Sequence, residues 1–171
     1  MIHESIETAL NEQILVEAQS SHLYLAMGTW CEVQGFNGAS KFLFLHSDEE
    51  RMHMLKLLHF INERGGQANI PALTAPKSTF NSLTEVFEAL LAHEIKVSAC
   101  INDLVEKTLD AKDYTTHNFL QWYVSEQIEE EGMARTILDK LKLIGNDKGG
   151  LYLFDTDLEK LAAQGLVEEE K

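Results

Sequence analysis

The chain has 171 residues, 44% of them apolar, and a formal net charge of −14. This length suffices for one domain with a substantial core, and a single domain over residues 1–171 is expected. The negative charge argues against nucleic acid as a partner, because its phosphates would be repelled. No stretch approaches eighteen consecutive apolar residues, so no membrane-spanning segment and no membrane partner are predicted.

The start of the chain and its cysteines bear on cellular location. Residues 1–13, MIHESIETALNEQ, have neither the basic nor the apolar region of a signal peptide. Cys31 and Cys100 belong to no CxxC motif, and two buried, reduced thiols are the simplest interpretation. A cytoplasmic protein is therefore expected.

Helical periodicity begins close to the N-terminus, and no stretch shows the alternation of a β-strand. The first helix is predicted at about residues 5–33, before the helix-breaking Gly35. The second is predicted at about 38–64, with Asn37 as its N-cap and Gly65 after its last turn.

The second half of the chain repeats this arrangement. The third helix is predicted at about 82–111, because Ser82 and Glu85 form a capping-box pattern. The fourth is predicted to follow Asp113, a good N-cap, and to end at Ile144 before a glycine.

The connections decide how these helices are arranged. Short links join the first helix to the second and the third to the fourth, so each pair is predicted to form an antiparallel hairpin. The middle link, Gly65 to Asn81, contains both prolines and is long enough to cross the length of the bundle. The prediction is an all-α four-helix bundle at about residues 5–144 with one long crossover. A short fifth helix is expected at about 149–164.

The core-facing stripe of each predicted helix is interrupted near its middle by polar side chains. Read at the alternating four- and three-residue spacing of bundle helices, the interrupting residues are Glu17, Glu50, His53, Glu94, Gln127 and Glu130. Helices with matched ends place their midpoints in one layer. The six side chains are therefore predicted to meet in the core.

Four carboxylates in a core need compensating charge. A buried carboxylate without a partner costs several kcal/mol, against a typical total stability of about 5–15 kcal/mol. No lysine or arginine occupies these central stripe positions, so protons, water or metal must compensate. Two divalent cations balance the formal −4, and oxygen donors with one imidazole favour iron or manganese, although zinc could occupy the same cage. The alternative is a hydrated polar layer that only fixes helix register.

More acidic residues flank this layer in VSEQIEEEG, residues 124–132. Glu126 and Glu129 each precede a stripe position of this helix by one residue, and Glu49 precedes Glu50 in the same way on the second helix. If these flanks face each other, a second oxygen-rich pocket forms from Glu49, Glu126, Glu129 and the edge of Glu130. A solvated acidic face is the alternative. Glu131 is interpreted as surface, and His46, one turn before Glu50, as a hydrogen-bonded core residue rather than a metal ligand.

Several motifs resemble those of a known family over essentially the whole chain. They are Asn11-Glu12-Gln13 with Glu17, Tyr24, Glu49-Glu50-x-x-His53, Glu94, and above all HNFLQWYVSEQIEEEG at residues 117–132. The chain resembles the bacterial non-haem ferritins. The resemblance implies a ferritin-like four-helix bundle with a long crossover between helices 2 and 3 and a short C-terminal fifth helix.

The resemblance also implies a ferroxidase centre that binds iron. One iron site would comprise Glu17, Glu50 and His53, and its neighbour Glu50, Glu94 and Glu130. Gln127 would help to bind or position dioxygen beside the second site. The flanking carboxylates would make a third iron site from Glu49, Glu126, Glu129 and Glu130.

The implied reaction is the oxidation of Fe²⁺ by dioxygen or hydrogen peroxide, with storage of a ferric mineral inside a homo-oligomeric shell of 24 subunits. Tyr24, and Trp122 nearby, would supply an extra electron, or they are core aromatic residues with satisfied polar tips. Haem is not expected. Bacterioferritins carry methionine where this chain has Arg51, and a fourth-helix Glu-x-x-His where it has Gln127-x-x-Glu130.

Two other functions fit the pattern less well. A di-iron oxygenase or peroxidase would normally repeat Glu-x-x-His on the fourth helix. A non-catalytic bundle with a polar layer would bind no metal and form a small oligomer.

Overall fold

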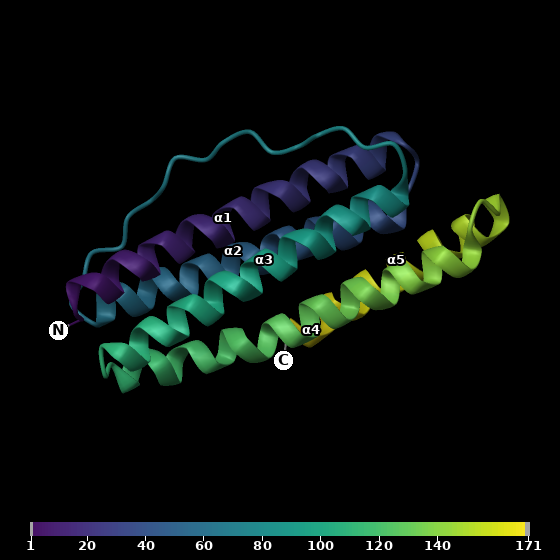
Figure 1. Cartoon of the computed structure of the whole chain (residues 1–171). Coiled ribbons are helices and arrows are strands. Elements are labelled where there is room, and N and C mark those ends of the chain that lie inside the picture. The colour runs from purple at the N-terminus through teal and green to yellow at the C-terminus, as the bar shows by residue number, and fades with distance from the viewer. Residues whose placement is uncertain (1, 170–171) are drawn as a thin grey trace.

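The computed structural model describes residues 2–169, with side chains for residues 2–163. Five helices and no strand occur in this part of the chain (Figure 1). They are α1 (Glu4–Val33), α2 (Asn37–Glu63), α3 (Leu83–Asp110), α4 (Tyr114–Ile144) and α5 (Lys148–Glu169).

The first four helices form the bundle that the sequence predicts. Short turns join α1 to α2 and α3 to α4, and the connection of residues 64–82 runs along the bundle to reach α3 (Figure 1). Gly35 ends α1 and Gly65 ends α2 with positive φ angles of 85° and 77°, a conformation that costs glycine little. The predicted all-α bundle with one long crossover is confirmed.

The apolar core consists of two clusters, one toward each end of the bundle. One includes Tyr24, Leu43 and Leu90, and the other includes Ile14 and Leu57. On all four bundle helices, the polar residues at the middle of the stripe fall between these clusters. The apolar ends thus supply the hydrophobic stabilisation and leave a polar layer at mid-height.

The start of α4 is capped by an acidic side chain. Asp113 accepts a hydrogen bond from the backbone N–H of Thr116 at 3.1 Å, which agrees with its predicted N-cap role. The guanidinium of Arg64 donates to both Asp113 oxygens at 3.1 and 3.2 Å. This bidentate ion pair links the end of α2 to the start of α4.

The predicted N-cap of α2 is wrong. The helix already begins at Asn37, and Phe36 at the cap position supplies no side-chain hydrogen bond. Instead, Asp155 of α5 accepts hydrogen bonds from the N–H groups of Gly38 at 3.0 Å and Ala39 at 2.8 Å. A residue more than a hundred positions away provides the cap, which local sequence patterns do not reveal.

The fifth helix is longer than predicted. It reaches Glu169 instead of ending near residue 164, and it lies along α2. Phe154, Leu158 and Ala162, each four residues apart, are buried against the core cluster that contains Leu43. The apolar stripe of α5 therefore continues the core of the bundle.

The expectations for the two cysteines and for membrane-spanning segments can be compared with the described residues. Cys31 is buried and Cys100 is half-buried, and both are free thiols. None of the helices in residues 2–169 is long and apolar enough to cross a membrane.

Candidate metal centre

The polar residues predicted at the helix midpoints are all buried. None is more than 7% exposed, and the set comprises Glu17, Glu50, His53, Glu94, Gln127 and Glu130. Tyr24 is fully buried as well. Their positions between the two apolar clusters bring them to one height of the bundle, as the stripe pattern predicts.

Glu17, Glu50 and His53 form a close group in this layer. Their ligand atoms all lie within 4.8 Å of one another. Nδ1 of His53 is 3.9 Å from Oε2 of Glu17 and 3.6 Å from Oε2 of Glu50. The spacing Glu50-x-x-His53 places both side chains on the same face of α2.

Neighbouring side chains hold this group in position. Gln13, one turn before Glu17 on α1, donates from Nε2 to Oε1 of Glu17 at 2.8 Å. The hydroxyl of Tyr123 donates to the backbone carbonyl of His53 at 2.8 Å, and the ring of Trp122 lies edge-on to His53 with centroids 5.1 Å apart. Gln13 occurs in the motif at residues 11–13 and Tyr123 in the motif at residues 117–132, but the sequence analysis assigned neither residue a contact in the layer.

Glu94 of α3 is held from two other helices. The hydroxyl of Tyr24 donates to Oε1 of Glu94. The amide of Gln127 donates from Nε2 to Oε2 of Glu94 at 2.9 Å and to its backbone carbonyl at 3.2 Å. Glu94 and Glu130 do not belong to the tight group around Glu50, so the carboxylates predicted to share a second metal ion lie farther apart than those of the first.

Two oxygens in the layer have no hydrogen-bond partner. They are Oε2 of Glu50 and Oε2 of Glu130, both buried. Buried polar atoms are normally satisfied, since leaving one without a partner costs about 1–3 kcal/mol, and more for a charged group. Unpaired carboxylate oxygens beside an imidazole are the donor set of a site for a hard or borderline cation, so these residues fit a divalent metal.

The electrostatics of the layer also favour a cation. Burial raises the pKa of Glu50 and of Glu94 to about 7, and that of Glu130 to about 9. Burial and the nearby Glu50 raise the pKa of Glu17 as well. Each carboxylate holds its proton more tightly than usual because low dielectric and neighbouring negative charge disfavour the ionised form. A metal ion would replace those protons.

Comparison with known proteins agrees with this architecture. The family described as "Ferritin-like domain" matches residues 7–144, which cover nearly all of the bundle.

The chain belongs to the ferritin family.

A "Probable bacterial non-heme ferritin-like protein" of Haemophilus influenzae is 48% identical over 96% of the chain and 99% of its own length. A "Bacterial non-heme ferritin" of Campylobacter jejuni is 44% identical over 95% and 97%. Among solved structures, an open-pore ferritin from Archaeoglobus fulgidus superposes with a TM-score of 0.92 at 42% identity, over 93% of this chain and 98% of that one.

The flank of the layer differs from its predicted form in this ferritin. Glu126 is half-buried and Glu129 is exposed, and neither joins a close group of metal-ligand atoms. A close group does form at this place from His46, Glu49 and Glu130. The third site of Glu49, Glu126, Glu129 and Glu130 therefore stays a prediction, and His46, interpreted from the sequence as a core residue, lies close to two of its members.

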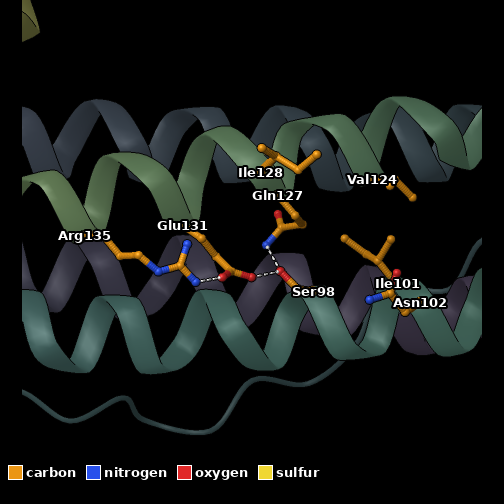
Figure 2. A pocket seen from close by; sticks show the side chains of 8 residues that line it. All are labelled: Ser98, Ile101, Asn102, Val124, Gln127, Ile128, Glu131 and Arg135. Carbon is orange, nitrogen blue, oxygen red and sulfur yellow. Dashed lines mark hydrogen bonds and ion pairs between the residues drawn. The ribbon is translucent and has the colours of Figure 1, made fainter.

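A hydrogen-bonded chain leads from the layer to a surface pocket between α3 and α4, as Figure 2 shows. Nε2 of Gln127 donates to Oγ of Ser98 at 3.2 Å, and that hydroxyl donates to Oε1 of Glu131 at 2.6 Å. Arg135 forms an ion pair with Glu131. The hydrogen bond from Ser98 lowers the pKa of Glu131. The prediction of Glu131 as ordinary surface was wrong, because α3 supplies a partner that the α4 sequence cannot show.

Lys56 contacts an aromatic residue beside this layer. Its Nζ lies 3.5 Å from the centroid of the Trp122 ring, in the range of a cation–π interaction. Trp122 is 37% exposed, so the ring connects His53 to a surface pocket lined by residues of α2 and α4, whereas Tyr24 contacts the layer from within the core.

Proposed function

We propose that the protein is an iron-storage ferroxidase. It oxidises Fe²⁺ to Fe³⁺ with dioxygen or hydrogen peroxide and deposits the product as a ferric mineral. The proposed assembly is a shell of 24 copies in the cytoplasm, with no haem and no nucleic-acid or membrane partner. Iron is the substrate and cargo of this reaction.

The observation that carries the proposal is the pair of buried carboxyl oxygens without hydrogen-bond partners. Oε2 of Glu50 and Oε2 of Glu130 lack partners. Among the described residues, no lysine or arginine forms an ion pair with the four central glutamates. A fold that kept this layer only for register would satisfy those oxygens with protein donors. Metal ligation explains why they are left open.

The proposed ligand roles follow the two parts of the layer. The first Fe²⁺ is assigned to Glu17, Glu50 and His53, whose ligand atoms lie within 4.8 Å of one another. The second is assigned to Glu50, Glu94 and Glu130, with Gln127 beside it as the residue that positions the oxidant. Two ferrous ions held side by side can each give one electron to the same oxidant molecule.

Storage and assembly are supported by the relatives and by the surface. The names of the relatives describe bacterial non-haem ferritins, and shells are the assemblies in which ferritins hold mineral. Leu143, in the last turn of α4, and Tyr152 and Leu153, near the start of α5, are 89%, 74% and 64% exposed. Such apolar side chains on one segment are suited to contacts with neighbouring copies.

The proposed oxidation is tested by replacing one ligand. Glu50→Ala removes a carboxylate from both proposed iron positions, and we expect ferric absorbance after mixing Fe²⁺ with aerated buffer to appear roughly tenfold more slowly or worse. Glu88→Ala, on the exposed side of α3, is the matched control and should oxidise iron like the unaltered protein. Equal rates in the two variants would reject the central layer as the oxidation site.

A further inference from the structure

Trp122 of α4 is the aromatic side chain that links the central layer to the surface. Its ring lies edge-on to that of His53 with centroids 5.1 Å apart, and both residues line a surface pocket between α2 and α4. Indole rings are among the most easily oxidised side chains of proteins. A partly exposed indole beside a proposed iron ligand is therefore a target for the oxidant that reacts at this layer.

A lysine covers the face of this ring. Lys56 lies one turn after His53 on α2, and its Nζ is 3.5 Å from the centroid of the Trp122 ring, inside the limit of about 6 Å for a cation–π interaction. Partial burial lowers the pKa of Lys56, and the neighbouring carboxylate of Glu126 counteracts this shift. Because Lys56 is exposed as a whole, its ammonium stays charged at neutral pH.

Oxidation of the ring would reverse the sign of this interaction. The neutral indole attracts the ammonium through the negative potential of its π face. Loss of one electron turns the ring into a radical cation, and two positive charges then face each other across the same short distance. The contact with Lys56 stabilises the neutral ring and destabilises the oxidised ring, so it makes removal of the electron from Trp122 less favourable.

The position of this cation is selective. The sequence contains one other tryptophan, Trp30, which packs edge-on against Phe80 with centroids 5.8 Å apart. Within residues 2–163, no lysine or arginine lies over the ring of Trp30 or over that of Tyr24, which reaches the layer through its hydroxyl. The tryptophan that the ammonium covers is the one that packs against a proposed iron ligand.

We propose that Lys56 protects Trp122 from one-electron oxidation during the reaction at the central layer. The step that it suppresses is the transfer of one electron from the indole to the oxidant, after which the N–H proton would pass to water and leave a neutral indole radical. Lys56 acts through the ring that it covers and binds neither iron nor oxidant. The proposal rests on the proposed function, which supplies dioxygen or hydrogen peroxide as the oxidant.

Protection of this ring decides which groups supply electrons. The sequence leaves both Tyr24 and Trp122 open as donors of an extra electron, and the ammonium over Trp122 removes that ring from the role. Electrons for the oxidant then come from Fe²⁺ and, where the protein supplies one, from Tyr24. The side chain that packs against His53 also stays intact through repeated cycles of iron oxidation.

The test removes the charge over the ring. Lys56→Met keeps an unbranched side chain that can still cover the indole. The assembled protein is taken through repeated additions of Fe²⁺ in aerated buffer, and oxygenated tryptophan is then quantified by mass spectrometry of its peptides. We expect oxygenated Trp122 to increase roughly fivefold in this variant. Trp30 is the internal reference and should not change.

Two further variants separate charge from packing. Lys56→Arg keeps a cation that stacks on aromatic faces, and it should restore the protection of Trp122. Lys140→Met removes an exposed lysine from α4, the helix that carries Trp122, and should behave like the unaltered protein.

A second oxidant distinguishes failure of this proposal from failure of the proposed function. Azide radicals remove one electron from indole rings without iron, so they are applied to the assembled metal-free proteins before the same peptide analysis. The same roughly fivefold increase at Trp122 is expected in Lys56→Met. If the layer does not oxidise iron, ferric absorbance fails to develop in the unaltered protein, but the azide experiment still decides the role of Lys56.

Three results would overturn the proposal. The first is equal oxygenation of Trp122 in Lys56→Met and in the unaltered protein, either with azide radicals or in a protein that oxidises iron. The second is an Lys56→Arg variant that leaves Trp122 as readily oxidised as Lys56→Met does. The third is an increase at Trp30 as large as that at Trp122, because it would indicate a general loosening of the bundle instead of the loss of one charge.

Discussion

Burial of these carboxyl groups lowers the free energy of unfolding of the metal-free ferritin at neutral and higher pH. Glu130 is 7% exposed and faces the negative charge of Glu94 and Glu50, which together with burial raises its pKa to about 9. The folded protein therefore binds protons more tightly than the unfolded chain, in which a glutamate titrates near its ordinary value. The stability that this proton provides is complete below pH 4.5 and is lost as the pH rises toward 9.

Replacing Glu130 should reveal how much the burial of this carboxyl group costs in stability. At pH 8 the unfolded chain ionises Glu130 whereas the metal-free folded protein must keep it protonated, and Glu130→Gln removes this penalty, so we expect the free energy of unfolding to increase on the order of a few kcal/mol at pH 8. The increase should shrink toward pH 5, because the glutamate of the unfolded chain takes up its proton there as well. Thermal unfolding of the metal-free proteins at pH 5, 6.5 and 8 measures it. A gain that is the same at every pH would show that burial of charge is not its cause.

A second prediction concerns Ser98, which touches none of the proposed ligand carboxylates directly. Its hydroxyl donates to Glu131 and accepts from Gln127 (Figure 2), and this fixes which way the amide of Gln127 points. Ser98→Ala should leave anaerobic Fe²⁺ binding at the same stoichiometry but slow the oxidation roughly fivefold, the value of one hydrogen bond of about 1 kcal/mol.

Ser98→Thr is the control, because it keeps the hydroxyl and should restore the rate. Stopped-flow absorbance after mixing with oxygen, together with an anaerobic titration, separates the two effects. If alanine changed the number of irons bound, or threonine failed to restore oxidation, a role in positioning Gln127 would be excluded.

At this scale the sequence predicted which residues share the layer but not how they contact one another. The stripes place Glu17, Glu50 and Glu94 at helix midpoints, and four helices with matched ends must bring them together. The rotamer that each of these side chains adopts is decided by its partners on other helices. The hydrogen bond of Glu94 to Tyr24 and the approach of His46 to Glu130 could not be read from spacing along a single helix.

Among the elements, α5 has a structural role beyond covering the bundle. Asp155 caps the N-terminus of α2 with two backbone hydrogen bonds. A Cβ at Gly38 would overlap the backbone carbonyl of Asp155, so only glycine permits this approach. The predicted helix boundaries were good where the signals are local, as at Asp113, and failed at Asn37 because this cap comes from a distant part of the chain.

Removal of this cap should loosen α5 from α2. Asp155→Ala should lower the free energy of unfolding by about 0.5–2 kcal/mol, the usual range for an N-cap, and should increase hydrogen exchange at the first turn of α2. Asp157→Ala, an exposed acid on the same helix, is the matched control and should change little. Protection of Gly38 and Ala39 that stays the same in Asp155→Ala would contradict the cap.

On the scale of the whole molecule, the bundle is two apolar cores that hold a polar layer between them. The cores stabilise the fold, and the long helices that join them keep the layer buried and at fixed height. This division lets four carboxylates remain in the interior, because the apolar ends offset their cost. The same separation explains why the fold could be predicted from hydrophobic periodicity. The apolar stripes follow this periodicity at both ends of the bundle, and polar residues interrupt it only in the middle.

This layer is proposed to bind iron in pairs and to oxidise it. The most direct measurement is a titration of the metal-free protein with Fe²⁺ under anaerobic conditions, followed by admission of oxygen while ferric absorbance is recorded. We predict two tightly bound Fe²⁺ per chain in the central layer, rapid oxidation on admission of oxygen, and further loading far beyond that number as soluble mineral. A protein that bound no Fe²⁺, or whose bound Fe²⁺ stayed ferrous in oxygen, would contradict the account.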